Sequence, residues 1–268
     1  MTPILDAQGL CKKFGAVTAA WGISISVEPD TVVGLIGTNG AGKTTFVNMV
    51  TGYLKPDAGI ISFKGRDVTA LHPRQITQLG ICRSFQIPQL YDSLTVLENV
   101  IVALGIVLRN SKPSRLGRTP KIVPGHGTTL MAAAESMLAR FGLVQYRNSP
   151  AGVLPEGVRK LLDIAMALAV KPEMLILDEP TSGVSSDEKF GIMDTVMNAV
   201  RSEGVTVLFV EHDMEIVSRY SKRVIAFYEG RVLADGAPAH VLGDPDVRKY
   251  VVGGQVAVRA PAEDIARA

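Results

Sequence analysis

One short glycine-rich segment, residues 37–44, constrains the fold of this chain more than any other part of its sequence. It matches the pattern G-x-x-x-x-G-K-[ST], in which the glycines let the backbone wrap closely around phosphate groups. The apolar run before it, residues 31–36, is typical of a strand buried on both faces of a parallel sheet. A helix is expected to follow at about residues 42–51. Strand, loop and helix in this order predict a nucleotide-binding α/β fold.

The loop supplies candidate ligands for a nucleoside triphosphate and magnesium. Its backbone N–H groups and the positive end of the following helix would face phosphate oxygens. Lys43 is expected to reach the β- and γ-phosphates, and the hydroxyl of Thr44 to bind Mg²⁺. The residues that this pattern assigns to the nucleotide are Gly37, Thr38, Asn39, Gly40, Ala41, Gly42, Lys43 and Thr44.

Three further candidates follow buried strands. The apolar run at residues 174–177 leads into Asp178 and Glu179, and His212 follows the next one, residues 205–210. The carboxyl ends of parallel strands meet at one edge of a sheet, so these side chains are expected near the phosphates. Consecutive residues leaving a strand point in different directions. Asp178 can therefore face the metal while Glu179 faces the attacking water as general base, and His212 is expected to approach the γ-phosphate.

Strands that alternate with helices along the rest of the chain predict a parallel sheet with right-handed crossovers. Short strands broken by glycine and proline are expected over residues 4–36, and a hairpin over residues 223–234. A buried helix is expected at residues 158–170, because that segment is apolar nearly all round. A capping box at residues 185–188 predicts the start of another helix, which stops before Gly204.

Residues 88–158 interrupt this pattern and are interpreted as a helical subdomain. A capping box at residues 95–98 predicts the start of one helix, and a second helix is expected from about Leu130 to Arg140, with Gly142 just past its end. Residues 109–127, between the two helices, are basic and rich in Pro, Gly and Ser. They are interpreted as an exposed, solvated loop.

Composition argues against several classes of protein. A formal net charge of +2 disfavours nucleic acid as a partner, since duplex-binding proteins usually carry a strong basic field.

Cys11 and Cys82 form no CxxC pair, so buried thiols in a reducing cytosol are expected rather than a disulfide framework or zinc site. The longest clean apolar run, residues 100–108, is far shorter than the roughly 20 residues that span a bilayer. No secretory signal is evident, so the chain is expected to stay in the cytoplasm.

Taken together, six elements in this order resemble the ATPase subunits of ABC transporters. Phe14 resembles the aromatic residue that stacks on adenine, and residues 37–45 have the family's Walker A form, which adds Thr45 to the nucleotide ligands. Gln86 resembles the Q-loop glutamine that couples the magnesium site to the transmembrane subunit. Residues 154–160 occupy the signature position, and residues 175–179 are similar to Walker B with its catalytic glutamate.

His212 resembles the family's switch histidine, which completes the six elements. The resemblance implies that ATP and Mg²⁺ are bound, that Gln86, Glu179 and His212 are catalytic, and that Thr44, Gln86 and Asp178 lie at the metal. It also implies a P-loop NTPase fold: a RecA-like parallel sheet core with an N-terminal antiparallel β subdomain and an inserted helical subdomain. One ABC ATPase domain would cover residues 1–253, followed by a tail at residues 254–268.

Three finer features resemble those of the branched-chain amino acid uptake ATPases of this family. They are residues 95–100, the basic insertion and the ending near residues 236–245. This resemblance implies two permease subunits, a second ATPase subunit and, indirectly, an extracytoplasmic substrate-binding protein as partners. It implies a place at the cytoplasmic face of the cell membrane. The expected function is ATP hydrolysis that powers uptake of branched-chain or other hydrophobic amino acids or related solutes. The sequence does not reveal the solute, because the permeases and the binding protein select it.

The signature segment departs from the family pattern L-S-G-G-Q. It reads Leu154-Pro155-Glu156-Gly157-Val158, in which the proline supplies neither hydroxyl nor N–H and the glutamate adds negative charge. Residues 182–185 also lack the usual Asp or Asn at the end of the D-loop. These departures predict an asymmetric heterodimer. The site with this chain's Walker motifs and the partner's signature would hydrolyse ATP, and the other site would turn it over poorly.

Three alternative functions make different demands on the sequence. A GTPase needs an N-K-x-D guanine reader, which the sequence lacks. Non-transport ABC ATPases that act on DNA or ribosomes usually carry two cassettes, zinc modules or long coiled coils, and the sequence shows none of these in its single, nearly neutral cassette. A regulatory cassette without hydrolysis is suggested by the altered signature, whereas the intact Lys43, Asp178, Glu179 and His212 disfavour it.

Overall fold

The computed structural model describes residues 2–84, 89–110 and 122–253 of the 268-residue chain. Its strands are β1 (Leu5–Phe14), β2 (Val17–Val27), β3 (Val32–Gly37), β4 (Ala58–Phe63), β5 (Arg66–Asp67), β6 (Ile81–Ser84), β7 (Met174–Asp178), β8 (Thr206–Val210), β9 (Arg223–Tyr228) and β10 (Arg231–Gly236). Its helices are α1 (Lys43–Val50), α2 (Pro73–Leu79), α3 (Val96–Asn110), α4 (Leu130–Arg140), α5 (Glu156–Ala169), α6 (Lys189–Arg201), α7 (Met214–Tyr220), α8 (Pro238–Gly243) and α9 (Pro245–Val247). Short helical turns lie at Val144–Tyr146, Ala151–Val153 and Arg248–Val252.

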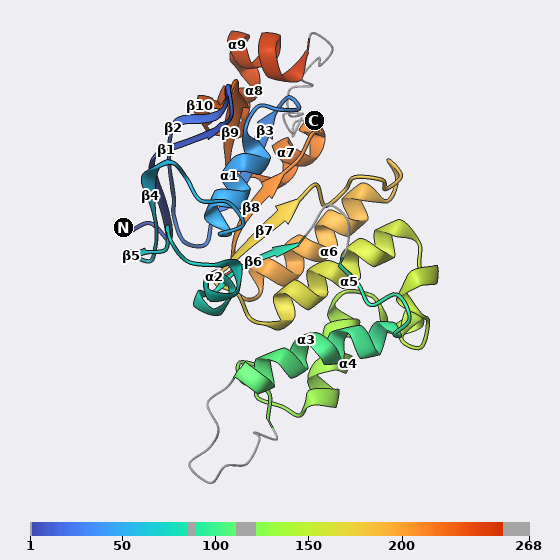
Figure 1. The fold of residues 1–268 in the computed structure, drawn as a ribbon. Coiled ribbons are helices and arrows are strands. Elements are labelled where there is room, and N and C mark those ends of the chain that lie inside the picture. The colour runs from blue at the N-terminus through green and yellow to red at the C-terminus, as the bar shows by residue number, and fades with distance from the viewer. Residues whose placement is uncertain (1, 85–88, 111–121, 254–268) are drawn as a thin grey trace, which may run out of the picture.

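Two β-sheets form the framework (Figure 1). The first is antiparallel, with the order β2-β1-β4-β5, and the second has the order β10-β9-β3-β8-β7-β6. In the second sheet the strands from β9 to β6 run parallel, and β10 pairs antiparallel with β9 as the predicted hairpin. The predicted α/β fold with an N-terminal antiparallel β subdomain is therefore confirmed.

The parallel sheet is covered on both faces. Side chains alternate along β3, so that Val32 and Ile36 enter one hydrophobic cluster while Val33 and Leu35 enter the other. The first cluster contains side chains of α3 to α7, and the second contains those of α1 and the antiparallel sheet. Because both faces are filled with apolar side chains, the edge at which the parallel strands end is the natural place for polar chemistry.

The helical portion agrees with its predicted start signals. The Thr95 N–H donates to Glu98 Oε2 at 2.8 Å, and the Glu98 N–H donates to Thr95 Oγ1 at 3.2 Å, so the capping box opens α3 as expected. Thr129 caps α4 through its hydroxyl, and Gly142 follows that helix with a φ of +65°. Helices α3 and α4 pack against each other at one end of the molecule (Figure 1). The proposed limits of the subdomain and tail remain predictions.

Several local predictions were wrong. Strands β1 and β2 are 10 and 11 residues long, because Gly9 and Gly22 lie inside them near shifts of register instead of ending them. The expected capping box at residues 185–188 does not form. Ser185 Oγ instead donates to the carboxylate of Glu188, and α6 begins at Lys189 without a side-chain cap.

The cysteine and loop predictions were correct in part. Cys82 is buried, whereas Cys11 is only half-buried. Arg109, expected in a loop, belongs to the last turn of α3, and most of that predicted loop falls at residues 111–121, outside the described ranges. Across the three described stretches, no helix combines the length and the apolar character needed to cross a membrane.

Candidate functional site

The glycine-rich loop joins β3 to α1 at the carboxyl edge of the parallel sheet. Gly42 caps α1 with a φ of 106°, a conformation that favours glycine. A Cβ atom at Gly42 would lie 2.8 Å from the carbonyl oxygen of Ala19 on β2. The Gly230 N–H, in the turn between β9 and β10, donates to the carbonyl of Ala41 at 3.0 Å. Close backbone contacts from β2 and from the β9–β10 turn therefore fix the shape of the loop.

Lys43 is the first residue of α1 and points back into the loop. Its Nζ donates to the carbonyl oxygens of Gly37 at 2.6 Å and Thr38 at 3.1 Å. Burial lowers the pKa of Lys43, and the negative charges of Glu179 and Asp178 oppose that shift. The ammonium is thus held inside the loop by carbonyl groups, where phosphate oxygens can take their place. Beside it, Thr44 is exposed and Thr45 is half-buried.

Asp178 ends β7 and is paired with an arginine that the sequence reasoning did not assign to the site. Asp178 Oδ2 accepts from Arg83 Nη2 at 2.5 Å, and Arg83 Nη1 donates to Asn48 Oδ1 at 2.7 Å. Arg83 lies opposite Ile176 in the β6–β7 pairing, so it projects from the same face of the sheet as Asp178. The signal that could have identified Arg83 is its charge within β6, a short strand whose other residues are buried.

Glu179 and His212 are brought together at the ends of β7 and β8. His212 Nε2 lies 3.0 Å from Glu179 Oε1, and the Glu179 N–H donates to the carbonyl of Val210 at 3.0 Å. The Glu179 side chain is 19% exposed and that of His212 is 43% exposed. The carboxylate is therefore enclosed while the imidazole is more exposed, an arrangement suited to a general base held by a neighbouring side chain.

Glu211 fixes the backbone around this pair and was also missed from the sequence. Its Oε1 accepts both the N–H and the hydroxyl of Thr181, at 2.9 and 2.6 Å, and its Oε2 accepts the N–H of His212 at 3.1 Å. Glu211 is only 3% exposed. A cavity of about 250 Å³ opens beside these groups. It is lined by Glu179, Thr181, Ser182, Val184, Ser186, Lys189, Glu211, His212 and Asp213.

The other predicted site residues lie at separate places. Phe14 ends β1 with its ring half-exposed, as an aromatic platform for a base requires. Pro155 caps α5 without a side-chain hydrogen bond, and the exposed Glu156 lies in the first turn of that helix. Gln86 falls in the segment 85–88, outside the described residues, so its predicted role stays a prediction.

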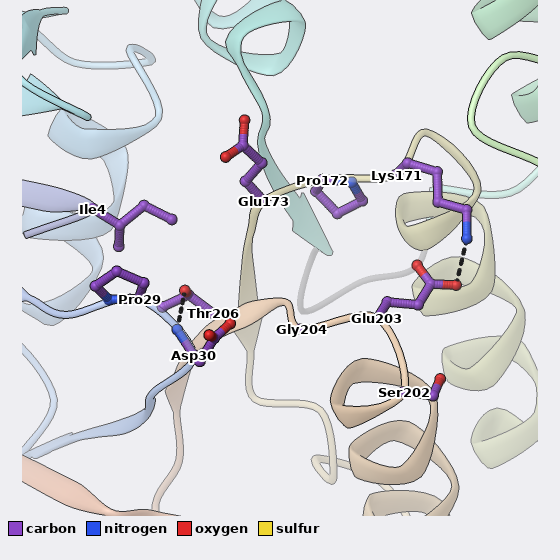
Figure 2. A pocket seen from close by; sticks show the side chains of 10 residues that line it. All are labelled: Ile4, Pro29, Asp30, Lys171, Pro172, Glu173, Ser202, Glu203, Gly204 and Thr206. Carbon is purple, nitrogen blue, oxygen red and sulfur yellow. Dashed lines mark hydrogen bonds and ion pairs between the residues drawn. The ribbon is translucent and has the colours of Figure 1, made fainter.

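A second cavity, of about 580 Å³, lies at the opposite edge of the parallel sheet (Figure 2). Asp30 precedes β3, Glu173 precedes β7 and Thr206 begins β8, so the lining comes from the amino ends of the strands. On its wall, Lys171 donates to Glu203 at 2.6 Å. This cavity is therefore separate from the residues grouped around the glycine-rich loop.

Comparison with known proteins gives matches along most of the chain. The sequence model described as ABC transporter matches residues 21–182. A similar curated protein is the high-affinity branched-chain amino acid transport ATP-binding protein LivG of Escherichia coli K12. It is 34% identical over 251 residues, which cover 94% of this chain and 98% of LivG.

Two similar solved structures extend the comparison to the fold. MJ1267, an ATP-binding cassette of an ABC transporter, superposes with a TM-score of 0.79 and 32% identity, covering 93% of this chain and 99% of that one. The cbiO1 protein of Clostridium perfringens, part of the transporter complex cbiONQ, gives a TM-score of 0.76 and 28% identity. That match covers 93% of this chain and 94% of cbiO1.

Proposed function

The chain belongs to the ABC transporter family as an ATP-binding subunit, and on this premise we propose that it drives solute uptake through partner permeases at the cytoplasmic face of the cell membrane. It is an ABC transporter ATPase, and such subunits work with permeases in transporter complexes. The observation that carries ATP hydrolysis in this proposal is the contact of 3.0 Å between Glu179 and His212, at the sheet edge that also holds the Lys43 loop.

The residues at this edge have complementary chemical roles in the proposed hydrolysis. The Walker A loop would hold the phosphates through its N–H groups and Lys43, while Phe14 would stack on adenine. Glu179 would take the proton of the attacking water, and His212 would hold Glu179 and contact the γ-phosphate. Gln86 would join this site to the permease, as the family resemblance implies.

The residues around Asp178 fit a magnesium ion. Mg²⁺ is usually bound in proteins by one or two carboxylates together with substrate phosphates and water. The carboxylate of Asp178 and the hydroxyl of Thr44 meet that need. Asp178 and Thr44 would hold the ion, which when bound would supply positive charge next to the phosphates.

We further propose branched-chain or other hydrophobic amino acids, or related small solutes, as the transported class. The support is the 34% identity to LivG along nearly the whole of both chains, together with the resemblance in the helical portion. The complex would contain two permease subunits, a second ATPase subunit and an extracytoplasmic binding protein. Affinity purification of the chain from membranes tests this assembly, and ligand screening of the co-purified binding protein tests the solute class.

The altered signature supports an asymmetric pair of ATP sites. Pro155 cannot offer an N–H or a hydroxyl, and the exposed Glu156 would bring negative charge toward the partner's nucleotide. Loss of one preorganised donor costs about 3 kcal/mol in well-studied hydrolases. The double substitution Pro155→Ser with Val158→Gln should therefore raise turnover at the site that uses this signature. Two equally active sites in the unaltered complex would contradict the asymmetry.

The substitution Glu179→Gln tests the hydrolytic role. It should lower kcat of the assembled complex by about 100-fold or more, because the general base is lost, while ATP still binds. Unchanged turnover would instead favour a regulatory cassette. Assembly without permeases would favour a non-transport ATPase.

A further inference from the structure

Lys160 joins the first turns of α5 to the loop that follows β7. Its Nζ donates to the backbone carbonyl oxygen of Glu179 at 2.9 Å, and only 3% of Lys160 is exposed. Burial lowers the pKa of Lys160, while the carboxylates of Glu156, Glu211, Glu179 and Asp163 raise it. A buried ammonium surrounded by carboxylates serves as their shared counter-charge.

Two of those carboxylates hold backbone segments that border the site. Glu211 binds the Thr181 N–H and hydroxyl on one side and the His212 N–H on the other. Asp163, three residues after Lys160 and on the same face of α5, accepts the N–H of Gln89 at 3.1 Å. This face of α5 therefore contacts two segments: the loop that contains Glu179, and the chain that follows the predicted Q-loop glutamine.

Glu179 needs such support because its backbone is in a disfavoured conformation. Its φ is +50°, in the left-handed region that residues with a Cβ rarely adopt. The peptide groups on its two sides are held by different elements: the N–H donates to Val210 on β8, and the carbonyl accepts from Lys160 on α5. The direction of the side chain, and hence its 3.0 Å contact with His212, depends on this backbone conformation.

We propose that Lys160 is a positioning residue for ATP hydrolysis, which holds the Glu179 carbonyl so that the carboxylate points toward the attacking water. Because Lys160 lies at the end of the signature segment, movement of that segment would reach Glu179 through this hydrogen bond. The inference rests on the proposed catalytic role of Glu179.

Steady-state kinetics of the purified transporter complex test the inference. In Lys160→Met, kcat should fall about tenfold or more, since small displacements of a reacting group are costly, while ATP affinity stays within about twofold. Lys160→Arg keeps the positive charge and the hydrogen-bond donors, so its kcat should stay within about threefold of that of the unaltered complex. The matched control is Lys171→Met, which removes an ion-paired lysine just past the other end of α5 and should leave kcat unchanged.

A further comparison separates positioning from general structural support. In a Glu179→Gln background, Lys160→Met should cause no additional loss of kcat, because it acts through Glu179. An unchanged kcat in Lys160→Met, an equal loss of ATP affinity, or full additivity with Glu179→Gln would overturn the inference. Lys160→Gln provides the same readouts if the methionine variant does not assemble. Absence of ATP hydrolysis by the unaltered complex would instead refute the proposed function.

Discussion

Arg83 and Asp178 form an ion pair beneath the magnesium side of the proposed ATP site, with 2.5 Å between Nη2 and Oδ2. Their side chains are 9% and 10% exposed. Asn48 on α1 fixes the same guanidinium group from the other side. Within the described residues, hydrogen bonds engage only Oδ2 of Asp178, so Oδ1 stays available for the proposed metal. The pair therefore sets the orientation of the carboxylate.

Replacement of Arg83 should weaken the use of magnesium more than the binding of nucleotide. In Arg83→Met, the Mg²⁺ concentration for half-maximal ATPase activity should rise about tenfold, while Mg²⁺-free ATP affinity stays within about twofold. The free energy of unfolding should fall by roughly 3 kcal/mol, because a buried carboxylate loses its partner. Magnesium titrations of activity and denaturant unfolding measure the two effects.

Arg66→Met is the control for this variant, since Arg66 is exposed on the edge strand β5. It should change neither quantity. An Arg83 variant with an unaltered magnesium dependence would show that the ion pair does not orient Asp178 for the metal.

Gly42 provides a prediction about the loop itself. An alanine there must keep a φ of 106° and place its Cβ 2.8 Å from the Ala19 carbonyl, so Gly42→Ala should abolish most ATP binding. Gly65→Ala is a matched control, because Gly65 has a φ of 76° and no atom within 4 Å of the added Cβ. Both variants bear the left-handed backbone cost of about 1–2 kcal/mol. Binding of a fluorescent ATP analogue should distinguish them, and equal affinities would contradict the steric argument.

The sequence predicted the parts of this fold that depend on local patterns. Continuous apolar runs identified β3, β7 and β8, since strands buried on both faces show no alternation. The Thr95–Glu98 capping box succeeded because its partners lie within one turn. The similar pattern at Ser185 failed because the Glu188 N–H donates to the Ser185 carbonyl oxygen, at 3.1 Å, and not to the hydroxyl.

The supporting residues of the site could not be predicted in the same way. Arg83, Lys160 and Glu211 each bind a group that lies at least 19 residues away in sequence. Their contacts depend on strand order and helix packing, which motif spacing does not contain. A charge inside or directly after an apolar element was the available signal, and it identifies a residue without identifying its partner.

The two cysteines should differ in reactivity. Burial raises the pKa of Cys82 to about 12, and the thiolate is the reactive form of a cysteine. A thiol reagent at about pH 8 should therefore label Cys11 in the folded chain and both thiols after unfolding. Cys11→Ser should abolish labelling of the folded protein. Rapid modification of Cys82 in that variant would show that β6 opens readily.

The pH dependence of stability should include a contribution from Asp213, which caps α7. Asp213 Oδ1 accepts the N–H of Glu215 at 2.9 Å, and Oδ2 accepts from Lys189 Nζ at 2.6 Å. Burial raises the pKa of Asp213, but the bonds from Lys189 and from the α7 amides outweigh it and keep that pKa below its ordinary value. A carboxylate of this kind stabilises the fold above its unfolded-state pKa of about 4, and this stability is lost as pH falls through the lower folded-state pKa.

Asp213→Ala should therefore lower the free energy of unfolding by about 1 kcal/mol at neutral pH, since cap and charge are both lost. The difference from the unaltered chain should shrink as pH falls below about 4. Asp213→Asn keeps the capping oxygen and isolates the charge, so its loss should be smaller at neutral pH and should vanish in acid. Glu215→Gln is the control, because its exposed carboxylate lies 3.3 Å from Lys189 and should contribute little. Urea unfolding at neutral and acidic pH measures these differences, and an Asp213→Ala loss that is the same at both would refute the linkage to ionisation.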